Sequence, residues 1–209
     1  MKVLVACEES QAVCIAFRKA GHEAYSCDIQ DESGGHPQWH IKGDALKEAY
    51  SGKYDMMIAF PPCTYLSNAG ARHLYPKGKL NEERFRKGIE GKAFFMALWN
   101  APIKHICVEN PTPSRIYSLP EPSQIVQPYM FGHPYTKRTL LWLKNLPILN
   151  STKIIDQYTP FIQSSAHRGL YQPPTISDAK ERSKTFTGIA KAMADQWNNP
   201  VYQEQLRLF

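Results

Sequence analysis

The opening segment of the chain constrains the fold more than any other part. Residues 2–6 (Lys-Val-Leu-Val-Ala) predict a buried strand, residues 11–19 a helix, and residues 22–27 a second strand. Ser10 is placed to cap the helix, and Gly21 is placed to end it. A strand, a helix and a strand in so short a segment form a β-α-β unit, which requires a parallel sheet with helices packed on it.

The remainder of the chain continues this alternation. Further strands are predicted at 39–42, 54–60, 105–108 and 139–143, and helices at 45–50, 80–100 and 188–197. The pattern predicts an α/β fold with a doubly wound, mostly parallel sheet. For a chain of 209 residues we expect a single domain over 1–209, in which the loop-rich segment 145–184 is an insertion.

Composition excludes some classes of protein and leaves others open. The chain has no apolar run as long as a membrane span and no signal-peptide pattern, which favours a cytoplasmic protein that does not enter a membrane. Its five cysteines include no C-x-x-C pair, and an odd number without a secretory signal indicates reduced thiols and no zinc site. Lys and Arg outnumber Asp and Glu by 25 to 19, an excess that suits a polyanionic partner but does not establish one.

A cysteine stands directly after the strand predicted at 54–60. Pro61 and Pro62 end this strand because neither can donate a hydrogen bond to a sheet. Cys63 then begins a polar loop, at the edge where open α/β sheets bind and transform ligands. The position suits a small buried residue as well as a nucleophile, and this stretch alone does not decide between them.

Acidic residues close two other predicted strands. Asp28 follows the strand at 22–27, where nucleotide-binding sheets carry an acid that accepts hydrogen bonds from ribose hydroxyls; a solvated turn residue is the alternative. Glu109, followed by Asn110, closes the strand at 105–108. Burying a carboxylate at a strand end is costly unless the group is paired or used in chemistry, so Glu109 is a candidate functional residue.

Taken in order, these motifs resemble those of the DNA cytosine-5 methyltransferases. Pro62-Cys63 matches the family's Pro-Cys nucleophile, and Glu109-Asn110-Pro111 lies at the place of its Glu-Asn-Val triplet. The resemblance implies that Cys63 adds to carbon 6 of cytosine. It also implies that Glu109 assists at ring nitrogen 3 and that Asn110 holds the geometry of the loop.

The family's arginine motif follows a Gly-x-Pro segment, which in this chain is Gly132-His133-Pro134. Lys137 and Arg138 lie where the family has arginines. The resemblance implies that these two residues orient the base and its phosphate and that a nearby cation lowers the pKa of the thiol.

The same resemblance implies S-adenosylmethionine as the cofactor, and the cysteine pattern predicts no metal site. The implied cofactor contacts are Cys7, Glu8, Glu9, Ser10, Asp28, Ile29, Gly43, Asp44, Pro61 and Thr187. The turn at residues 7–11 departs from the family because it has no glycine, and glycine there permits close approach of the backbone to the cofactor. Glu8 or Glu9 could meet the cofactor's ammonium group instead, or both could be exposed to solvent.

The implied partner is DNA, either a duplex with a flipped base or a single strand. The basic positions expected to contact phosphates are Arg72, Arg84, Lys137, Arg138 and Arg168. Little room remains between Arg138 and Thr187 for a separate target-recognition domain. The same core could therefore act on RNA or a free nucleotide, take its specificity from a protein partner, or bind cofactor and nucleic acid without turnover.

Overall fold

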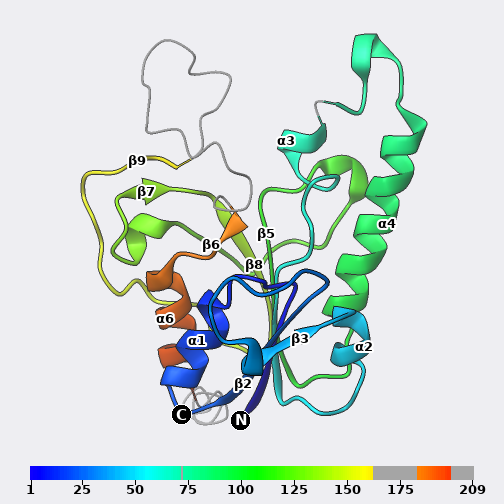
Figure 1. Cartoon of the computed structure of the whole chain (residues 1–209). Coiled ribbons are helices and arrows are strands. Elements are labelled where there is room, and N and C mark those ends of the chain that lie inside the picture. The colour runs from blue at the N-terminus through cyan, green and yellow to red at the C-terminus, as the bar shows by residue number, and fades with distance from the viewer. Residues whose placement is uncertain (72, 162–182, 199–209) are drawn as a thin grey trace.

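The structure is a computed structural model that describes residues 1–71, 73–161 and 183–198. Its strands are β1 (Lys2–Ala6), β2 (Glu23–Asp28), β3 (His40–Lys42), β4 (Met56–Ala59), β5 (His105–Asn110), β6 (Gln124–Val126), β7 (Tyr135–Thr136), β8 (Thr139–Lys144) and β9 (Thr159–Pro160). Its α-helices are α1 (Ala12–Lys19), α2 (Ala45–Ala49), α3 (Asn68–Ala71), α4 (Glu82–Trp99) and α6 (Thr187–Gln196). Short 3₁₀ helices are η1 (Pro37–Trp39), η2 (Pro76–Gly78), η3 (Arg115–Tyr117) and η4 (Pro128–Met130). Figure 1 shows a central sheet with helices on both of its sides.

Seven of the strands form one sheet, in the order β3-β2-β1-β4-β5-β8-β6. The pairs β1–β2, β2–β3, β1–β4 and β4–β5 are parallel, whereas β8 runs antiparallel to both of its neighbours, β5 and β6. The prediction of a doubly wound, mostly parallel sheet is therefore confirmed. The strand order reverses between β1 and β4, and ligands of such sheets bind in the crevice where the loops after two neighbouring strands diverge.

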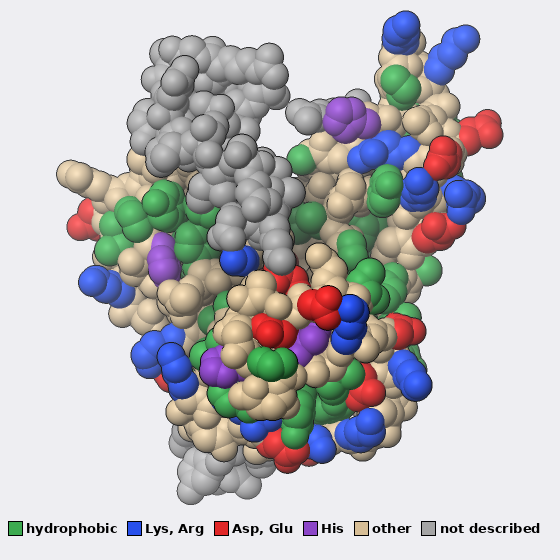
Figure 2. Space-filling view, in the orientation of Figure 1, with side chains coloured by type: hydrophobic (Ala, Val, Ile, Leu, Met, Phe, Trp, Pro, Cys, Tyr) green, Lys and Arg blue, Asp and Glu red, His purple; other side chains and the backbone are tan. Residues whose placement is uncertain are grey.

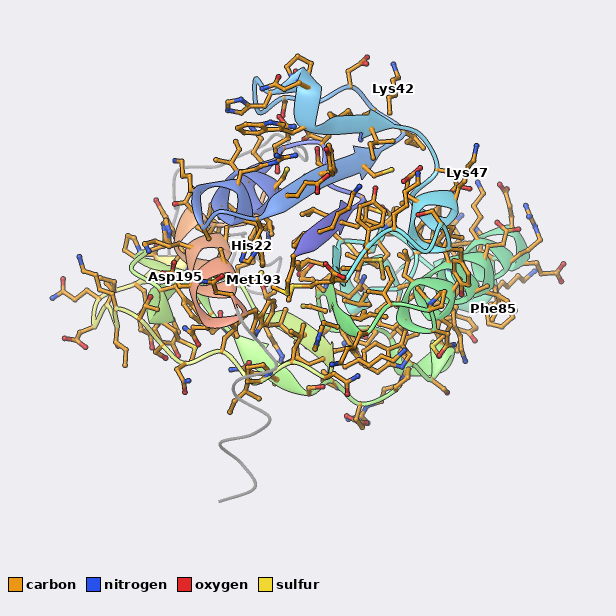
Figure 3. All side chains as sticks on the ribbon, turned by 90° about the horizontal axis from the view of Figure 1, so that it is seen from below. His22, Lys42, Lys47, Phe85, Met193 and Asp195 are labelled. Carbon is orange, nitrogen blue, oxygen red and sulfur yellow. The ribbon has the colours of Figure 1, made fainter. Side chains whose placement is uncertain are left out.

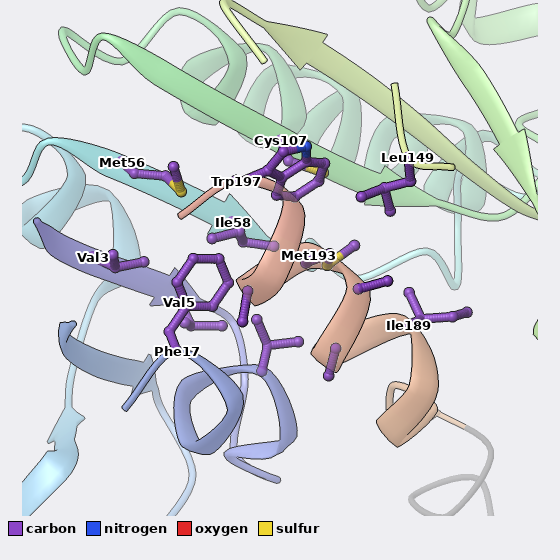
Figure 4. Close-up of a cluster of buried hydrophobic side chains, with 14 of the residues drawn as sticks. Val3, Val5, Phe17, Met56, Ile58, Cys107, Leu149, Ile189, Met193 and Trp197 are labelled. Carbon is purple, nitrogen blue, oxygen red and sulfur yellow. The ribbon is translucent and has the colours of Figure 1, made fainter. Parts of the chain in front are cut away.

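The two faces of the sheet carry separate apolar cores. Val3 and Val5 of β1 lie on the face covered by α1 and α6, while Leu4 and Ala6 lie on the face covered by α2 and α4, because successive strand residues point to opposite sides. Figure 3 shows these two helical layers on opposite sides of the sheet, and Figure 4 shows Trp197, at the end of α6, packed in the first core.

The helices agree with the sequence in their main features. The predicted inward-facing residues of α6 are all buried: Ile189, Ala190, Met193 and Trp197. Asn81 caps α4, because its side-chain oxygen accepts a hydrogen bond from Arg84 N at 3.0 Å. In the parts of the chain that the structure describes, no helix is both long and apolar enough to cross a membrane.

The prediction that Ser10 caps α1 is wrong. The helix begins one residue later than expected, with Gln11 at the cap position. The Gln11 side chain forms no capping hydrogen bond and is bonded to the backbone of His36 instead. The turn is left-handed at Cys7 and at Gln11, with φ angles of 59° and 58°. The buried carboxylate of Glu8 satisfies the helix start instead, because its two oxygens accept from Val13 N at 2.7 Å and from Cys14 N at 3.2 Å.

Three short strands were not predicted. β6 lies within a proline-rich segment that reads as a connection, and three residues are too few to show a strand period. β7 and β9 pair in parallel as a separate two-stranded sheet. β9 belongs to the segment expected to be a loop-rich insertion at 145–184, of which residues 162–182 lie outside the described part of the chain.

Replacing Glu8 by Gln should flatten the pH dependence of stability. Burial raises the pKa of Glu8 from 4.5 to about 7, although the bonds from Val13 and Cys14 oppose the rise. The folded protein therefore holds this proton more tightly than the unfolded chain, so the stabilisation is complete below pH 4.5 and is lost as the pH rises through about 7. Relative to Glu8→Gln, the wild-type free energy of unfolding should fall by about 3 kcal/mol across this window. Urea denaturation measures it, with exposed Glu82→Gln as the control. Parallel curves for the wild type and Glu8→Gln would refute the assignment.

Candidate active site

Three ionisable side chains from distant parts of the sequence meet at the carboxyl edge of the sheet. Cys63 follows β4, Glu109 is the last residue but one of β5, and Lys137 lies between β7 and β8. The strands β4 and β5 are parallel neighbours, so the segments that follow them leave the sheet side by side. The antiparallel strand β8 begins where β5 ends, with Leu140 opposite Asn110. The topology thus brings an acid, a thiol and an amine to one place.

The charges of these three groups act on one another. Burial raises the pKa of the Cys63 thiol, the Glu109 carboxylate raises it further, and the Lys137 ammonium opposes both effects. Burial also raises the pKa of Glu109, opposed by Lys137, and lowers the pKa of Lys137, opposed by Glu109 and Cys63. Because each group changes the charge state of the others, the protons belong to the cluster as a whole. Arg138 is exposed, so Lys137 is the cation that acts on the thiol.

Asn110 joins the ends of β4 and β5. Its side chain is completely buried, and Nδ2 donates to Pro61 O at 3.4 Å, two residues before Cys63. Its Oδ1 is buried and has no hydrogen-bond partner within the described residues. An unsatisfied buried acceptor costs about 1–3 kcal/mol, so this amide lowers stability at the point where it ties the two strand ends together.

Aromatic rings surround the Lys137 ammonium. Its Nζ lies 5.9 Å from the ring centroid of Phe186 and 6.0 Å from that of Phe161, and the two rings meet edge to face at 4.7 Å. A small pocket lies between Glu109, Lys137 and Phe186, with Met193 of α6 also in its wall. Its interior of about 20 Å³ has room for little more than one water molecule, so a pyrimidine ring would have to displace side chains to enter it.

Cys63 differs from the other cysteines in its surroundings. All five are free thiols, and Cys14, Cys27 and Cys107 are buried in regular elements. Burial raises the pKa of Cys7, Cys14 and Cys27 to about 12 and that of Cys107 well above its ordinary value.

Among the described residues no three His, Cys, Asp or Glu side chains are grouped so as to hold a metal ion.

The expected cofactor residues after β1, β2 and β3 gather at the same sheet edge. The charges of Asp28 and Asp44 add to the effect of burial on the Cys7 thiol, so both acids lie near the turn after β1. Gly43 N donates to Asp28 O at 2.8 Å, which fixes the two loops together. Each acid also has a local bond, Asp28 with Gln30 N and Asp44 with Leu46 N, both at 2.9 Å. Beside Asp28, the side chain of Ile29 is 77% exposed and offers an apolar surface.

The acids of the turn already have protein partners. Glu8 binds the start of α1, as described above, and Glu9 is hydrogen-bonded to Ser33 through both its carboxylate and its backbone carbonyl. The next residue, Gly34, packs so closely on the turn that a Cβ would lie 2.7 Å from Ser10 O. The loop after β2 therefore covers the turn. These contacts do not favour either acid as the partner of a cofactor's ammonium group.

The two remaining expected contacts, Pro61 and Thr187, lie after β4 and at the start of α6. His133 Nε2 accepts a hydrogen bond from Gly188 N at 2.9 Å, and Thr187 Oγ1 lies 3.5 Å from the same atom. A Cβ on Gly188 would lie 2.0 Å from Phe131 O, so only glycine allows this approach. The segment at 132–134 therefore docks on the first turn of α6, a contact that no sequence pattern indicated.

The basic positions expected to contact phosphates lie in different surroundings. Arg138 is exposed, whereas Arg84 binds backbone carbonyls of the loop that follows Cys63. Arg72 and Arg168 lie outside the described residues. Figure 2 shows basic side chains at the tip of the projecting segment before α4, where residues 77–79 include two exposed lysines.

Comparisons with known proteins find likeness in structure only. No protein-family model and no curated protein matches the chain. Among solved structures it resembles a candidate DNA modification methyltransferase encoded within an E. coli prophage, with a TM-score of 0.47 and 15% identity over 76% of this chain and 53% of that one. It also resembles the methyltransferase EhMeth of Entamoeba histolytica, with a TM-score of 0.46 and 15% identity over 74% of this chain and 57% of that one. A DNMT2 mutant of Spodoptera frugiperda is similar with a TM-score of 0.38 and 13% identity over 78% of this chain and 56% of that one. The chain thus spans little more than half the length of these proteins, and none of them identifies its family.

The reactivity of Cys63 should report the charges of its neighbours. Glu109→Gln removes a negative charge and should lower the midpoint of the alkylation pH profile of Cys63 by about one unit. Lys137→Met removes the opposing positive charge and should raise it. Iodoacetamide labelling followed by mass spectrometry of the Cys63 peptide measures both shifts. Lys104→Met is the control, since exposed Lys104 precedes β5 at the end opposite to Glu109. Coincident profiles for all four proteins would show that the three groups do not form one cluster.

Proposed function

We propose that this chain transfers a methyl group from S-adenosylmethionine to carbon 5 of cytosine in DNA, with Cys63 as the nucleophile. The observation that carries the proposal is that the pairing of β4, β5 and β8 brings Cys63, Glu109 and Lys137 together at the carboxyl edge of the sheet, where each affects the pKa of the others. Perturbed thiol, carboxyl and amine groups that converge in one place are typical of catalytic sites.

The reaction needs a nucleophile and a proton donor together. Carbon 5 of cytosine is a poor nucleophile until the thiolate of Cys63 forms a bond to carbon 6 and the ring electrons move toward nitrogen 3. Glu109 in its protonated form donates a proton to nitrogen 3, which leaves an enamine with electron density on carbon 5. The bound cofactor supplies an electrophilic methyl group. Once carbon 5 carries the methyl group and the cofactor has left as S-adenosylhomocysteine, nitrogen 3 returns its proton to Glu109. Carbon 5 then loses its proton to a base, and the bond between carbon 6 and the Cys63 sulfur breaks, which restores the aromatic ring and the thiolate.

The charge coupling suits this sequence of proton movements. A thiolate and a carboxylate repel each other, so ionisation of Cys63 is easiest when Glu109 carries a proton. Burial favours that protonated form of Glu109. The ammonium of Lys137 then offsets the charge of the thiolate.

The residues after β1, β2 and β3 fit the nucleoside half of the cofactor. Asp28 and Asp44 retain acceptor oxygens beyond their single local hydrogen bonds, which suits ribose hydroxyls and an adenine amine. Ile29 offers exposed apolar surface on which a purine could stack. The methionine half has no glycine-rich turn to receive it, and Pro61 and Thr187 are the proposed contacts near that end.

A second candidate function is binding without turnover. The pocket beside Glu109 and Lys137 is small, and Glu8 and Glu9 have partners within the protein. A core of this kind could bind nucleic acid and cofactor and catalyse nothing. Among enzymatic alternatives, RNA or a free nucleotide would replace DNA, and for a DNA substrate the target base would be flipped from a duplex or taken from a single strand, with or without a protein partner.

Covalent trapping tests the nucleophile. DNA that carries 5-fluorocytosine should form a stable adduct with the protein in the presence of S-adenosylmethionine, because fluorine on carbon 5 cannot leave as a proton does. Cys63→Ser should abolish the adduct, and Glu109→Gln should slow its formation by about 10²–10⁴-fold. Cys14→Ser is the matched control and should trap normally. Binding of cofactor and DNA without any adduct in the wild type would favour the non-catalytic alternative.

Calorimetry with S-adenosylhomocysteine tests the cofactor site. Asp28→Ala should weaken binding by about 1–3 kcal/mol, because ribose hydroxyls lose their acceptor. Asp28→Asn keeps the bond from Gln30 N and separates this effect from a change of the loop. Asp31→Ala is the control, since Asp31 is exposed and pairs with Lys42. The pocket is assigned wrongly if Asp28→Ala and Asp44→Asn both bind as the wild type does.

A further inference from the structure

Arg84 of α4 holds the loop that begins at Cys63. Its Nε donates to Gly70 O at 3.1 Å, and its Nη2 donates to Thr64 O at 3.0 Å. The guanidinium group also lies over the ring of Tyr65, 4.9 Å from the centroid. One side chain thus binds both ends of the loop formed by residues 64–70.

The loop is tightly closed where Arg84 binds it. A Cβ on Gly70 would lie 2.2 Å from Thr64 O, so the two ends of the loop are in direct contact. The carbonyl oxygen of Cys63 accepts from Leu66 N at 3.1 Å and from Ser67 N at 2.9 Å. The backbone of Cys63 is therefore part of the same closed turn, and its position depends on the shape of the loop.

The loop is also bonded to the segment that follows Glu109. Asn68 N donates to Thr112 O at 2.9 Å, and Ser114 N donates to Leu66 O at 2.7 Å. These bonds connect the loop to the end of β5. A change in the shape of the loop would consequently alter the separation between the thiol and the carboxylate.

We propose that Arg84 is a positioning residue, which keeps the Cys63 loop closed and the thiol within reach of Glu109 and Lys137. The inference rests on the proposed role of Cys63 as the nucleophile. Without the guanidinium group, the carbonyls of Thr64 and Gly70 lose the donors that draw the loop ends together. The loop then opens, and the charge of Glu109 acts less strongly on the thiol.

Arg86 provides a matched control on the same helix. It is exposed and forms an ion pair with Glu90, one turn further along α4. Replacing Arg86 by Ala removes the same charge and a similar side chain but leaves the Cys63 loop unchanged.

The test is a double-mutant cycle on the alkylation of Cys63 by iodoacetamide, followed over pH by mass spectrometry in the intact chain. Glu109→Gln is made in the wild type, in Arg84→Ala and in Arg86→Ala. The substitution should lower the midpoint by about one pH unit in the wild type and in Arg86→Ala, and by less than half as much in Arg84→Ala. Equal shifts in all three backgrounds would overturn the role of Arg84 while leaving the coupled active site intact. No shift in any background would instead contradict the charge cluster on which the proposed function rests.

A second variant covers a failure of Arg84→Ala to fold, which circular dichroism would detect. Arg84→Lys keeps the charge but cannot donate to both carbonyls with the same planar fork. We expect the Glu109→Gln shift in Arg84→Lys to fall between those in the wild type and in Arg84→Ala. If Arg84→Ala does not fold, Arg84→Lys alone decides. A shift of the Cys63 midpoint on Glu109→Gln that is as large in Arg84→Lys as in the wild type would then count against the role of the two hydrogen bonds.

Discussion

The parallel pairing of β1 with β4, and of β4 with β5, is the constraint on which the rest of the structure depends. It brings the carboxyl ends of three strands to one edge, so the turn at Cys7, the loop at Cys63 and the carboxylate of Glu109 leave the sheet in the same direction. The antiparallel strand β8 begins where β5 ends, and Lys137 just before it reaches the same edge. Residues that lie tens of positions apart in the sequence thereby come close enough for their charges to interact.

Burial then determines what these neighbours can do. A thiol, a carboxyl and an amine in water would keep their ordinary pKa values, and at neutral pH the acid and the amine would simply be charged. Burial away from water disfavours the charged form of each group. Whether a group is charged therefore depends on the charges of the other two. Ionisation of the thiol is therefore easiest when the carboxyl is protonated, and these are the two protonation states that the proposed activation of cytosine uses.

The elements with a clear local pattern could be predicted from the sequence, and the contacts between them could not. The strand that ends before Cys63 and the one that closes with Glu109 are read from apolar runs stopped by proline, which are local signals. The cap on α1 comes from Glu8 because the turn is left-handed, and no residue pattern indicates a left-handed cysteine. The positive charge of Arg84 predicted a contact with phosphate, whereas its guanidinium group donates to backbone carbonyls 14 and 20 residues earlier in the sequence. Likewise the contact of Phe186 with Lys137 depends on how α6 docks against the sheet edge.

The most direct test of the central claim, that the coupled cluster performs methyl transfer to carbon 5 of cytosine, is to follow the methyl group itself. The full chain is incubated with S-adenosylmethionine labelled in the methyl group and with duplex DNA, single-stranded DNA, RNA or free cytidine nucleotides. The products are then digested to nucleosides and separated. We predict label in 5-methyl-2′-deoxycytidine from at least one of the DNA substrates and none when Cys63 is replaced by Ser. Label on an exocyclic amine, or transfer that persists in Cys63→Ser, would contradict the account.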